Sequence, residues 1–227
     1  MIVSVGDIRR IWGEIDLGEG IHPYEERIFP TFCQIANRSE KILEIGVGRG
    51  RMVKILKANG VAADFFCLDL VAEHARDAPE NGVLGDSREL GFRDRSFDLT
   101  YSLGVVEHFP ETLKAIKEHA RVTKWGGYVF ISTPHRSLAT FVRLLIFHLK
   151  LKGKHHASFE VLLGRNISLR QMRQYCKEAG LEIIQLSASG PIIPAANPLL
   201  QRLVNVIPLP SRKFGAYLCC LARKLDA

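Results

Sequence analysis

The sequence predicts an α/β fold with a doubly wound, mostly parallel sheet. Strand-like and helix-like segments alternate through the first two-thirds of the 227 residues, a pattern typical of parallel sheets covered by helices on both faces. Residues 42–45 form a short apolar strand containing one acid, glycines follow at every second position, and residues 51–59 can form a helix. The length suits one large domain, and the sequence shows neither a linker-like segment nor an internal repeat. We therefore expect residues 1–227 to form a single domain.

The glycine turn after the first strand is a candidate ligand site. Gly46, Gly48 and Gly50 remove side chains where a ligand must approach the backbone, and they permit the positive φ angles of tight turns. A helix starting at Arg51 would direct its free amide groups at the same spot. Arg51 also stands where the dinucleotide fingerprint G-x-G-x-x-G requires a small residue, which argues against NAD. An ordinary strand-to-helix turn is the alternative interpretation.

Acidic residues end the next two predicted strands. Asp69 lies at the end of the strand at residues 61–70, and its carboxylate offers two acceptors in one plane, which suits the vicinal hydroxyls of a ribose. Asp86 and Ser87 close a shorter strand at residues 83–87. Asp86 can accept a hydrogen bond from a ligand, or it can form a local turn with its own backbone. Asp69 can likewise be a solvated residue at a strand end, so both ligand interpretations depend on the glycine turn.

Two further motifs follow these acids along the chain. Phe97 and Asp98 open a fourth predicted strand, and residues 105–108 read Val-Val-Glu-His soon after it. Residues 111–124 have helical spacing. They lead through an Arg-Val-Thr-Lys-Trp-Gly-Gly turn into a fifth predicted strand at residues 128–132.

Together with the acid-x-G-x-G-x-G spacing of residues 44–50, this order of motifs resembles the class I S-adenosylmethionine (SAM)-dependent methyltransferases, in particular their small-molecule and quinone-type branch. The resemblance covers about residues 40–135, and Trp125 is a departure from it because the family usually has proline there. It implies a Rossmann-like sheet of seven strands with an antiparallel last strand. Later segments fit loosely: a capped helix at residues 168–179, a sixth strand at 181–186 and a last strand at 214–222.

The resemblance also implies where SAM binds. The charged amino-acid end of SAM would lie over the glycine turn, its ribose at Asp69 and its adenine amino group at Asp86. The leading residues 1–38 would form a helical cover, with a helix at residues 24–36 interrupted near Pro30. The expected cofactor-binding residues are Glu44, Gly46, Gly48, Gly50, Asp69, Leu70, Asp86, Ser87, Ser102 and Leu103.

Methyl transfer from a sulfonium is a direct displacement that depends mainly on placing the nucleophile and excluding water. His108, just after the fourth strand, is the candidate catalytic base, and a histidine packed at the sheet end is the alternative. Glu107 can cap the following helix, with Pro110 in its first turn. We expect no metal, because the adjacent histidines at 155–156 would diverge on a helix.

The net charge of +7 is concentrated in one segment. Residues 134–177, the expected insertion between the fifth and sixth strands, contain nine Lys or Arg residues and one acid. The segment can cover an anionic or lipid-like substrate, dock on an anionic membrane surface, or contain an ordinary helix with solvated charges. Charge alone also allows nucleic acid, but no aromatic stacking platform or known RNA module accompanies it.

The expected function is therefore a SAM-dependent methyltransferase with a small-molecule or lipid-like acceptor. The alternatives are a non-catalytic SAM-fold protein that binds a partner through residues 134–177, or an RNA or protein methyltransferase. The five cysteines show no CxxC spacing, and the first 14 residues do not resemble a signal peptide. From the cysteine spacing we expect buried thiols. No apolar run reaches membrane-spanning length, and we expect a cytoplasmic protein.

Overall fold

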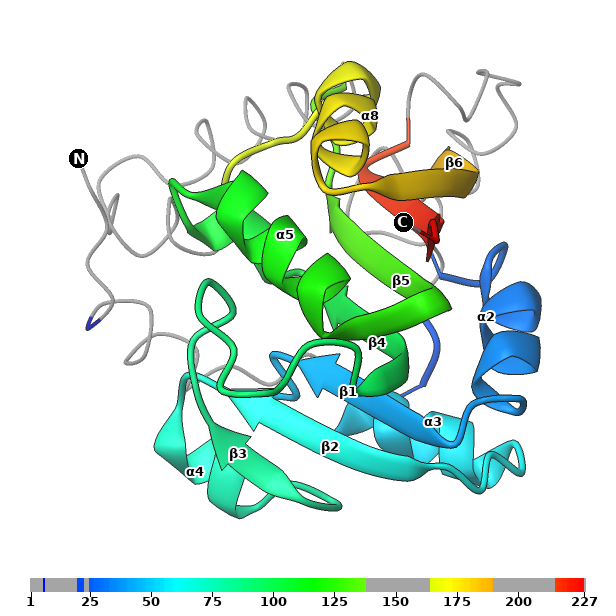
Figure 1. Cartoon of the computed structure of the whole chain (residues 1–227), viewed down its shortest axis with the longest axis vertical. Coiled ribbons are helices and arrows are strands. Elements are labelled where there is room, and N and C mark those ends of the chain that lie inside the picture. Colours follow the sequence, from blue (N-terminus) through cyan, green and yellow to red (C-terminus); the bar gives the residue numbers. More distant parts are fainter. Residues whose placement is uncertain (1–5, 7–19, 23–24, 138–163, 190–214, 227) are drawn as a thin grey trace, which may run out of the picture.

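The computed structural model describes residues 6, 20–22, 25–137, 164–189 and 215–226. Its centre is a seven-stranded sheet in the order β3-β2-β1-β4-β5-β7-β6 (Figure 1). The strands are β1 (Lys41–Ile45), β2 (Asp64–Asp69), β3 (Gly82–Leu84), β4 (Phe97–Leu103), β5 (Thr123–Pro134), β6 (Leu181–Ser189) and β7 (Tyr217–Lys224). The helices are α2 (Phe29–Ala36), α3 (Arg51–Ala58), α4 (Ala72–Arg76), α5 (Thr112–Val122), α8 (Leu169–Glu178) and the 3-10 helix η1 (Val106–His108).

Strand direction confirms the predicted fold class. Strands β3, β2, β1, β4 and β5 pair in parallel, whereas β7 is antiparallel to both β5 and β6. Strand order reverses at β1, because β2 lies on one side of it and β4 on the other. In open α/β sheets such a switch point leaves a crevice at the carboxyl ends of the strands.

The two faces of the sheet bury separate apolar clusters. Ile42 of β1 packs into the cluster formed with α2 and α3, while its neighbour Leu43 points to the other face. Phe32 of α2 lies against Tyr101 and Phe130, with ring centroids 5.2 and 4.8 Å apart. Helices α5 and α8 cover the opposite face over β5 and β7. The alternating burial expected of a sheet covered on both sides therefore holds.

Several predicted boundaries were wrong. Helix α2 begins at Phe29 with Pro30 in its first turn, so the proline starts the helix and does not interrupt it. Strand β2 begins at Asp64, three residues later than expected. The predicted turn before the fifth strand belongs largely to β5, since Thr123 pairs with Phe97 across a register shift.

The end of the chain agrees better with the sequence. Ser168 and Gln171 form the expected capping box at the start of α8, with the Gln171 N–H donating to Ser168 Oγ at 3.2 Å. None of the five cysteines forms a disulfide, and four of them are buried. Among the described residues, no helix is both long enough and apolar enough to cross a membrane.

Candidate cofactor and active site

A pocket lies at the carboxyl ends of β1, β2 and β4, where the strand order reverses. One part of its wall comes from the β2 end and α4, another from the loop after β3, and a third from the segment between β4 and α5. The lining residues are Ile45, Gly46, Gly48, Leu68, Asp69, Leu70, Val71, His74, Gly85, Ser87, Leu103, Gly104, Val105, His108 and Phe109.

The glycine turn has the backbone geometry that only glycine adopts easily. Gly46 has a φ of +77°, and a Cβ at this position would lie 2.3 Å from Val105 Cγ2. The N–H groups of Gly46 and Val47 donate to the Leu68 carbonyl at 2.7 and 3.1 Å. The turn is therefore held against the end of β2, with its backbone open to the pocket.

Asp69 fixes this turn from the next strand. Its Oδ2 accepts the Gly48 N–H at 2.8 Å, and its Oδ1 accepts the Val71 N–H at 2.8 Å. Oδ2 also lies 3.5 Å from Nδ1 of His74 on α4. Because a carboxylate has about four acceptor positions, two backbone bonds leave acceptor capacity on the wall of the pocket.

A buried ion pair between Arg51 and Glu25 lies beside the glycine turn. The Arg51 guanidinium donates to both carboxylate oxygens of Glu25, with Nη2···Oε1 at 2.6 Å and Nη1···Oε2 at 2.8 Å. Nη1 also donates to the Gly20 carbonyl at 2.7 Å. The Glu25 carboxylate is 1% exposed, so the leading segment is fixed to the first residue of α3 by a pair that has little contact with water.

His108 lines the pocket from η1, in the segment between β4 and α5. Its Nε2 is 3.1 Å from the Gly104 carbonyl oxygen and 3.8 Å from Glu107 Oε1. A carbonyl oxygen only accepts, so this contact requires the proton on Nε2 in the neutral ring and makes Nδ1 the basic nitrogen.

Glu107 beside it is buried. The sequence interpretation of Glu107 as a helix cap was wrong, because Glu111 is the N-cap of α5 and Pro110 precedes the helix. Burial raises the pKa of the Glu107 carboxyl to about 8. Its backbone carbonyl accepts the Arg165 N–H at 2.9 Å, so Glu107 also contacts the segment that leads to α8.

Comparison with known proteins identifies the domain. Residues 43–131 match the family described as "Methyltransferase domain". The chain is 29% identical over 168 residues to the "Probable tRNA methyltransferase 9B" of Bos taurus, covering 70% of this chain and 34% of that protein. It is 27% identical over 183 residues to the ubiquinone biosynthesis O-methyltransferase of Thiobacillus denitrificans, covering 74% of each.

A SAM-dependent methyltransferase from Archaeoglobus fulgidus has a similar structure, with a TM-score of 0.64 at 16% identity over 88% of this chain and 92% of that one. Residues 43–131 therefore match a methyltransferase family, and the sheet has the fold of solved SAM-dependent methyltransferases. The cofactor of this family is SAM. The chain spans about a third of the length of its bovine relative.

The pocket contains seven of the eleven residues that the sequence singled out. They are Gly46, Gly48, Asp69, Leu70, Ser87, Leu103 and His108. Gly50 lies outside it and, with a φ of +71°, forms the N-cap of α3. Ser102 also lies outside it, because its Oγ is bonded to Nε2 of the buried His119 at 3.0 Å.

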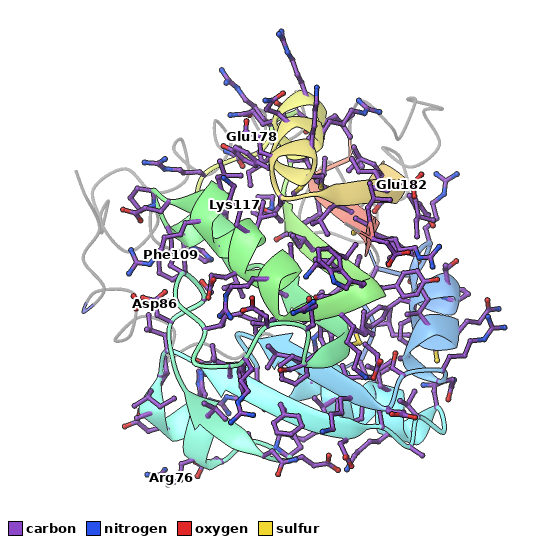
Figure 2. The ribbon with its side chains drawn as sticks, viewed as in Figure 1. Arg76, Asp86, Phe109, Lys117, Glu178 and Glu182 are labelled. Carbon is purple, nitrogen blue, oxygen red and sulfur yellow. The ribbon has the colours of Figure 1, made fainter. Side chains whose placement is uncertain are left out.

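Asp86 is placed differently from the expectation. Its Oδ1 accepts the Arg88 N–H at 2.8 Å in a local turn, and its Oδ2 is paired with the Arg88 guanidinium at 2.7 Å. Arg88 in turn lies over the ring of Phe109, 4.5 Å from its centroid, and Figure 2 shows Asp86 and Phe109 on the same side of the molecule. The neighbours Gly85 and Ser87 line the pocket instead.

Glu44 lies in β1 below the glycine turn and does not line the pocket. It is 3% exposed, and its Oε2 has no hydrogen-bond partner among the described residues. Burial raises the pKa of this carboxyl to about 8. The open backbone at Gly46 and Gly48 borders the pocket and leaves room for the amino-acid end of SAM, whereas the Glu44 carboxyl lies outside the lining.

Sequence reasoning missed His74 and most apolar lining residues. His74 belongs to no motif, and only its position one turn into α4 brings it to the pocket. The apolar residues could not be told from core residues by pattern alone.

Among the described residues, no group of three or more His, Cys, Asp or Glu side chains could hold a metal ion.

Proposed function

We propose that this chain transfers a methyl group from SAM to a small-molecule or lipid-like acceptor. The observation that carries the proposal is one pocket that brings together the glycine turn, Asp69 and His108. Asp69 would accept the ribose hydroxyls through the acceptor positions that Gly48 and Val71 leave open. The amino-acid end would lie over Gly46 and Gly48, above the Glu44 carboxyl.

We assign the adenine to the wall formed by Gly85 and Ser87, and not to the Asp86 carboxylate. The Asp86 oxygens are occupied by Arg88, whereas Gly85 and Ser87 face the pocket. A Cβ at position 85 would lie 2.7 Å from Leu68 Cδ1, which explains a glycine at this close approach. Backbone groups at 85–87 can then recognise the base edge without a charged side chain.

His108 would act as a general base. When bound, SAM supplies a methyl group already activated by the positive sulfur. His108 would hold its Nε2 proton against the Gly104 carbonyl. Nδ1, which is buried in this structure, would accept the acceptor's proton once it is brought to face the acceptor. Val105 and Phe109 line the same pocket and would limit the access of water to the reacting atoms.

Similarity supports a small acceptor over a large one. The ubiquinone biosynthesis relative aligns over 74% of both chains, whereas the tRNA methyltransferase relative has two-thirds of its length outside the alignment. The basic composition of residues 134–177 fits an anionic acceptor. The same charge favours RNA as a second candidate, and the bovine relative's name supports testing it.

The test is a measurement of S-adenosylhomocysteine (SAH) formed from SAM with panels of phenols, quinols, anionic and prenylated compounds, and transfer RNA. Turnover with a small molecule, reduced at least about 100-fold by His108→Ala, is the expected result. Turnover with RNA alone would contradict the acceptor class. Binding of SAH without turnover on any acceptor would favour the non-catalytic alternative.

The cofactor is tested separately by thermal shift, because a ligand that binds only the folded state raises the apparent stability. SAM and SAH should raise the melting temperature, and NAD should not.

A further inference from the structure

His74 lines the pocket, but none of the sequence motifs includes it and the proposed methyl transfer does not use it. It lies in α4, on the wall that continues from Asp69, Leu70 and Val71. Its side chain is 12% exposed, so most of the imidazole is packed, yet the residue still borders the pocket. A histidine that served only to end a surface helix would project into solvent.

The imidazole of His74 lies close to the same carboxylate that fixes the glycine turn. Its Nδ1 lies 3.5 Å from Asp69 Oδ2, the oxygen that accepts the Gly48 N–H. The other oxygen accepts from Val71, which is the N-cap residue of α4. Asp69 therefore orients the first turn of α4, and with it the imidazole, relative to the glycine turn.

The imidazole has the properties that an adenosine wall needs. It is a flat aromatic surface on which a base can stack, and it carries N–H groups that can donate to a hydroxyl. The other described lining residues on this side, including Leu68, Gly85 and Ser87, are small or apolar. Asp69 offers only acceptors when ionised and Ser87 supplies a hydroxyl, so His74 adds the aromatic face that this wall otherwise lacks.

We propose that His74 is a cofactor-binding residue that directly contacts the adenosine part of SAM. The proposal rests on the proposed SAM site and extends it by one residue. In this arrangement Asp69 accepts from the ribose, and the imidazole packs against the same nucleoside from α4. His74 has no part in the methyl transfer itself, since His108 is the proposed base.

The test is calorimetric titration of His74→Ala with SAH and with 5′-methylthioadenosine, which keeps the adenosine part and lacks the amino-acid end. We expect His74→Ala to weaken both ligands by a similar factor of about 10, within the range measured for loss of an aromatic stacking partner. The control is Glu73→Ala, an exposed position in the same helix, which should leave both affinities within twofold.

A second variant separates the ring from its contact with Asp69. His74→Asn keeps an N–H donor near the carboxylate but removes the aromatic ring, so it should behave like His74→Ala. The His74→Ala effect should also persist in an Asp69→Asn background, because the contact with adenosine is direct.

Unchanged SAH affinity in a folded His74→Ala would overturn the proposal, as would a loss for SAH that is absent for 5′-methylthioadenosine. Wild-type affinity in His74→Asn, or an effect that vanishes with Asp69→Asn, would show that His74 only positions the carboxylate. If the wild-type protein binds neither ligand, the proposed function itself fails, and the two failures are thus distinguishable.

Discussion

The two ends of the pocket are built differently. At the glycine turn, the Asp69 carboxylate is paired by short hydrogen bonds, because each of its oxygens accepts a backbone N–H at 2.8 Å, although Glu44 Oε2 in β1 has no partner among the described residues. At the His108 end, Glu107 is buried with one carboxyl oxygen lacking a partner among the described residues, and its carbonyl bonds to Arg165, far along the chain. The contrast suggests a preformed cofactor end and an acceptor end that depends on distant segments.

The largest expected effect concerns the support of the cofactor end. Arg51→Ala should lower the free energy of unfolding by about 3–5 kcal/mol, because it leaves the buried Glu25 carboxylate without its partner. The control is Arg76→Ala, which removes an exposed pair with Asp77, and Figure 2 shows Arg76 at the edge of the molecule. Denaturant unfolding should show only a small change for this control. Equal losses for the two variants would mean that the Arg51 pair does not support the turn.

Two glycine substitutions test the two sides of the pocket separately, one through SAH binding and the other through turnover. Gly46→Ala combines a positive φ with a clash against Val105 and should weaken SAH binding at least about tenfold. Gly164→Ala would place a Cβ 2.5 Å from Glu107 Cγ, so it should reduce turnover while SAH affinity stays within twofold. Gly60→Ala is the control for backbone strain alone, since its φ is +83° and no atom lies within 4 Å. Loss of SAH affinity in Gly164→Ala would show that the two ends are not independent.

Much of the cofactor end could be predicted from the sequence because its determinants are local. The glycines at 46 and 48 and the acid at 69 lie at strand ends, and a parallel sheet brings those ends together. The role of Asp86 stays a prediction, and no sequence pattern showed that Arg88, two residues later, pairs with its carboxylate. His74 was missed because no spacing rule marks a side chain one turn into a short helix.

The acceptor end could be predicted only in part. His108 follows its strand directly, but the burial of Glu107 depends on packing against Gly164, more than 50 residues away. The cover expected from residues 1–38 and the insertion at 134–177 fall largely outside the described residues, so their roles stay predictions.

The smallest expected effect concerns the charge state of Glu107. Its pKa is raised from 4.5 to about 8, so the folded protein keeps a proton that the unfolded chain releases. Its contribution to stability is therefore present below pH 4.5 and is lost as the pH rises toward 8. Glu107→Gln should remove this contribution. Between pH 4.5 and pH 8, the free energy of unfolding of the variant should therefore fall less than that of the wild type, by at least about 1 kcal/mol.

Denaturant unfolding at pH 5 and pH 8 measures this difference. The pKa of Glu44 is also raised, so the free energy of unfolding of Glu107→Gln still declines with rising pH because of Glu44. An identical pH dependence in wild type and Glu107→Gln would show that the Glu107 carboxyl is already ionised in the folded protein.

We propose that Asp69 binds the cofactor and that His108 acts on the acceptor in the same pocket. The most direct test is calorimetric titration of wild type, Asp69→Ala and His108→Ala with SAH. We predict one site per chain in the wild type, a loss of at least about tenfold in affinity for Asp69→Ala, and a change within twofold for His108→Ala. Wild-type affinity in Asp69→Ala, or a larger loss in His108→Ala than in Asp69→Ala, would contradict this account.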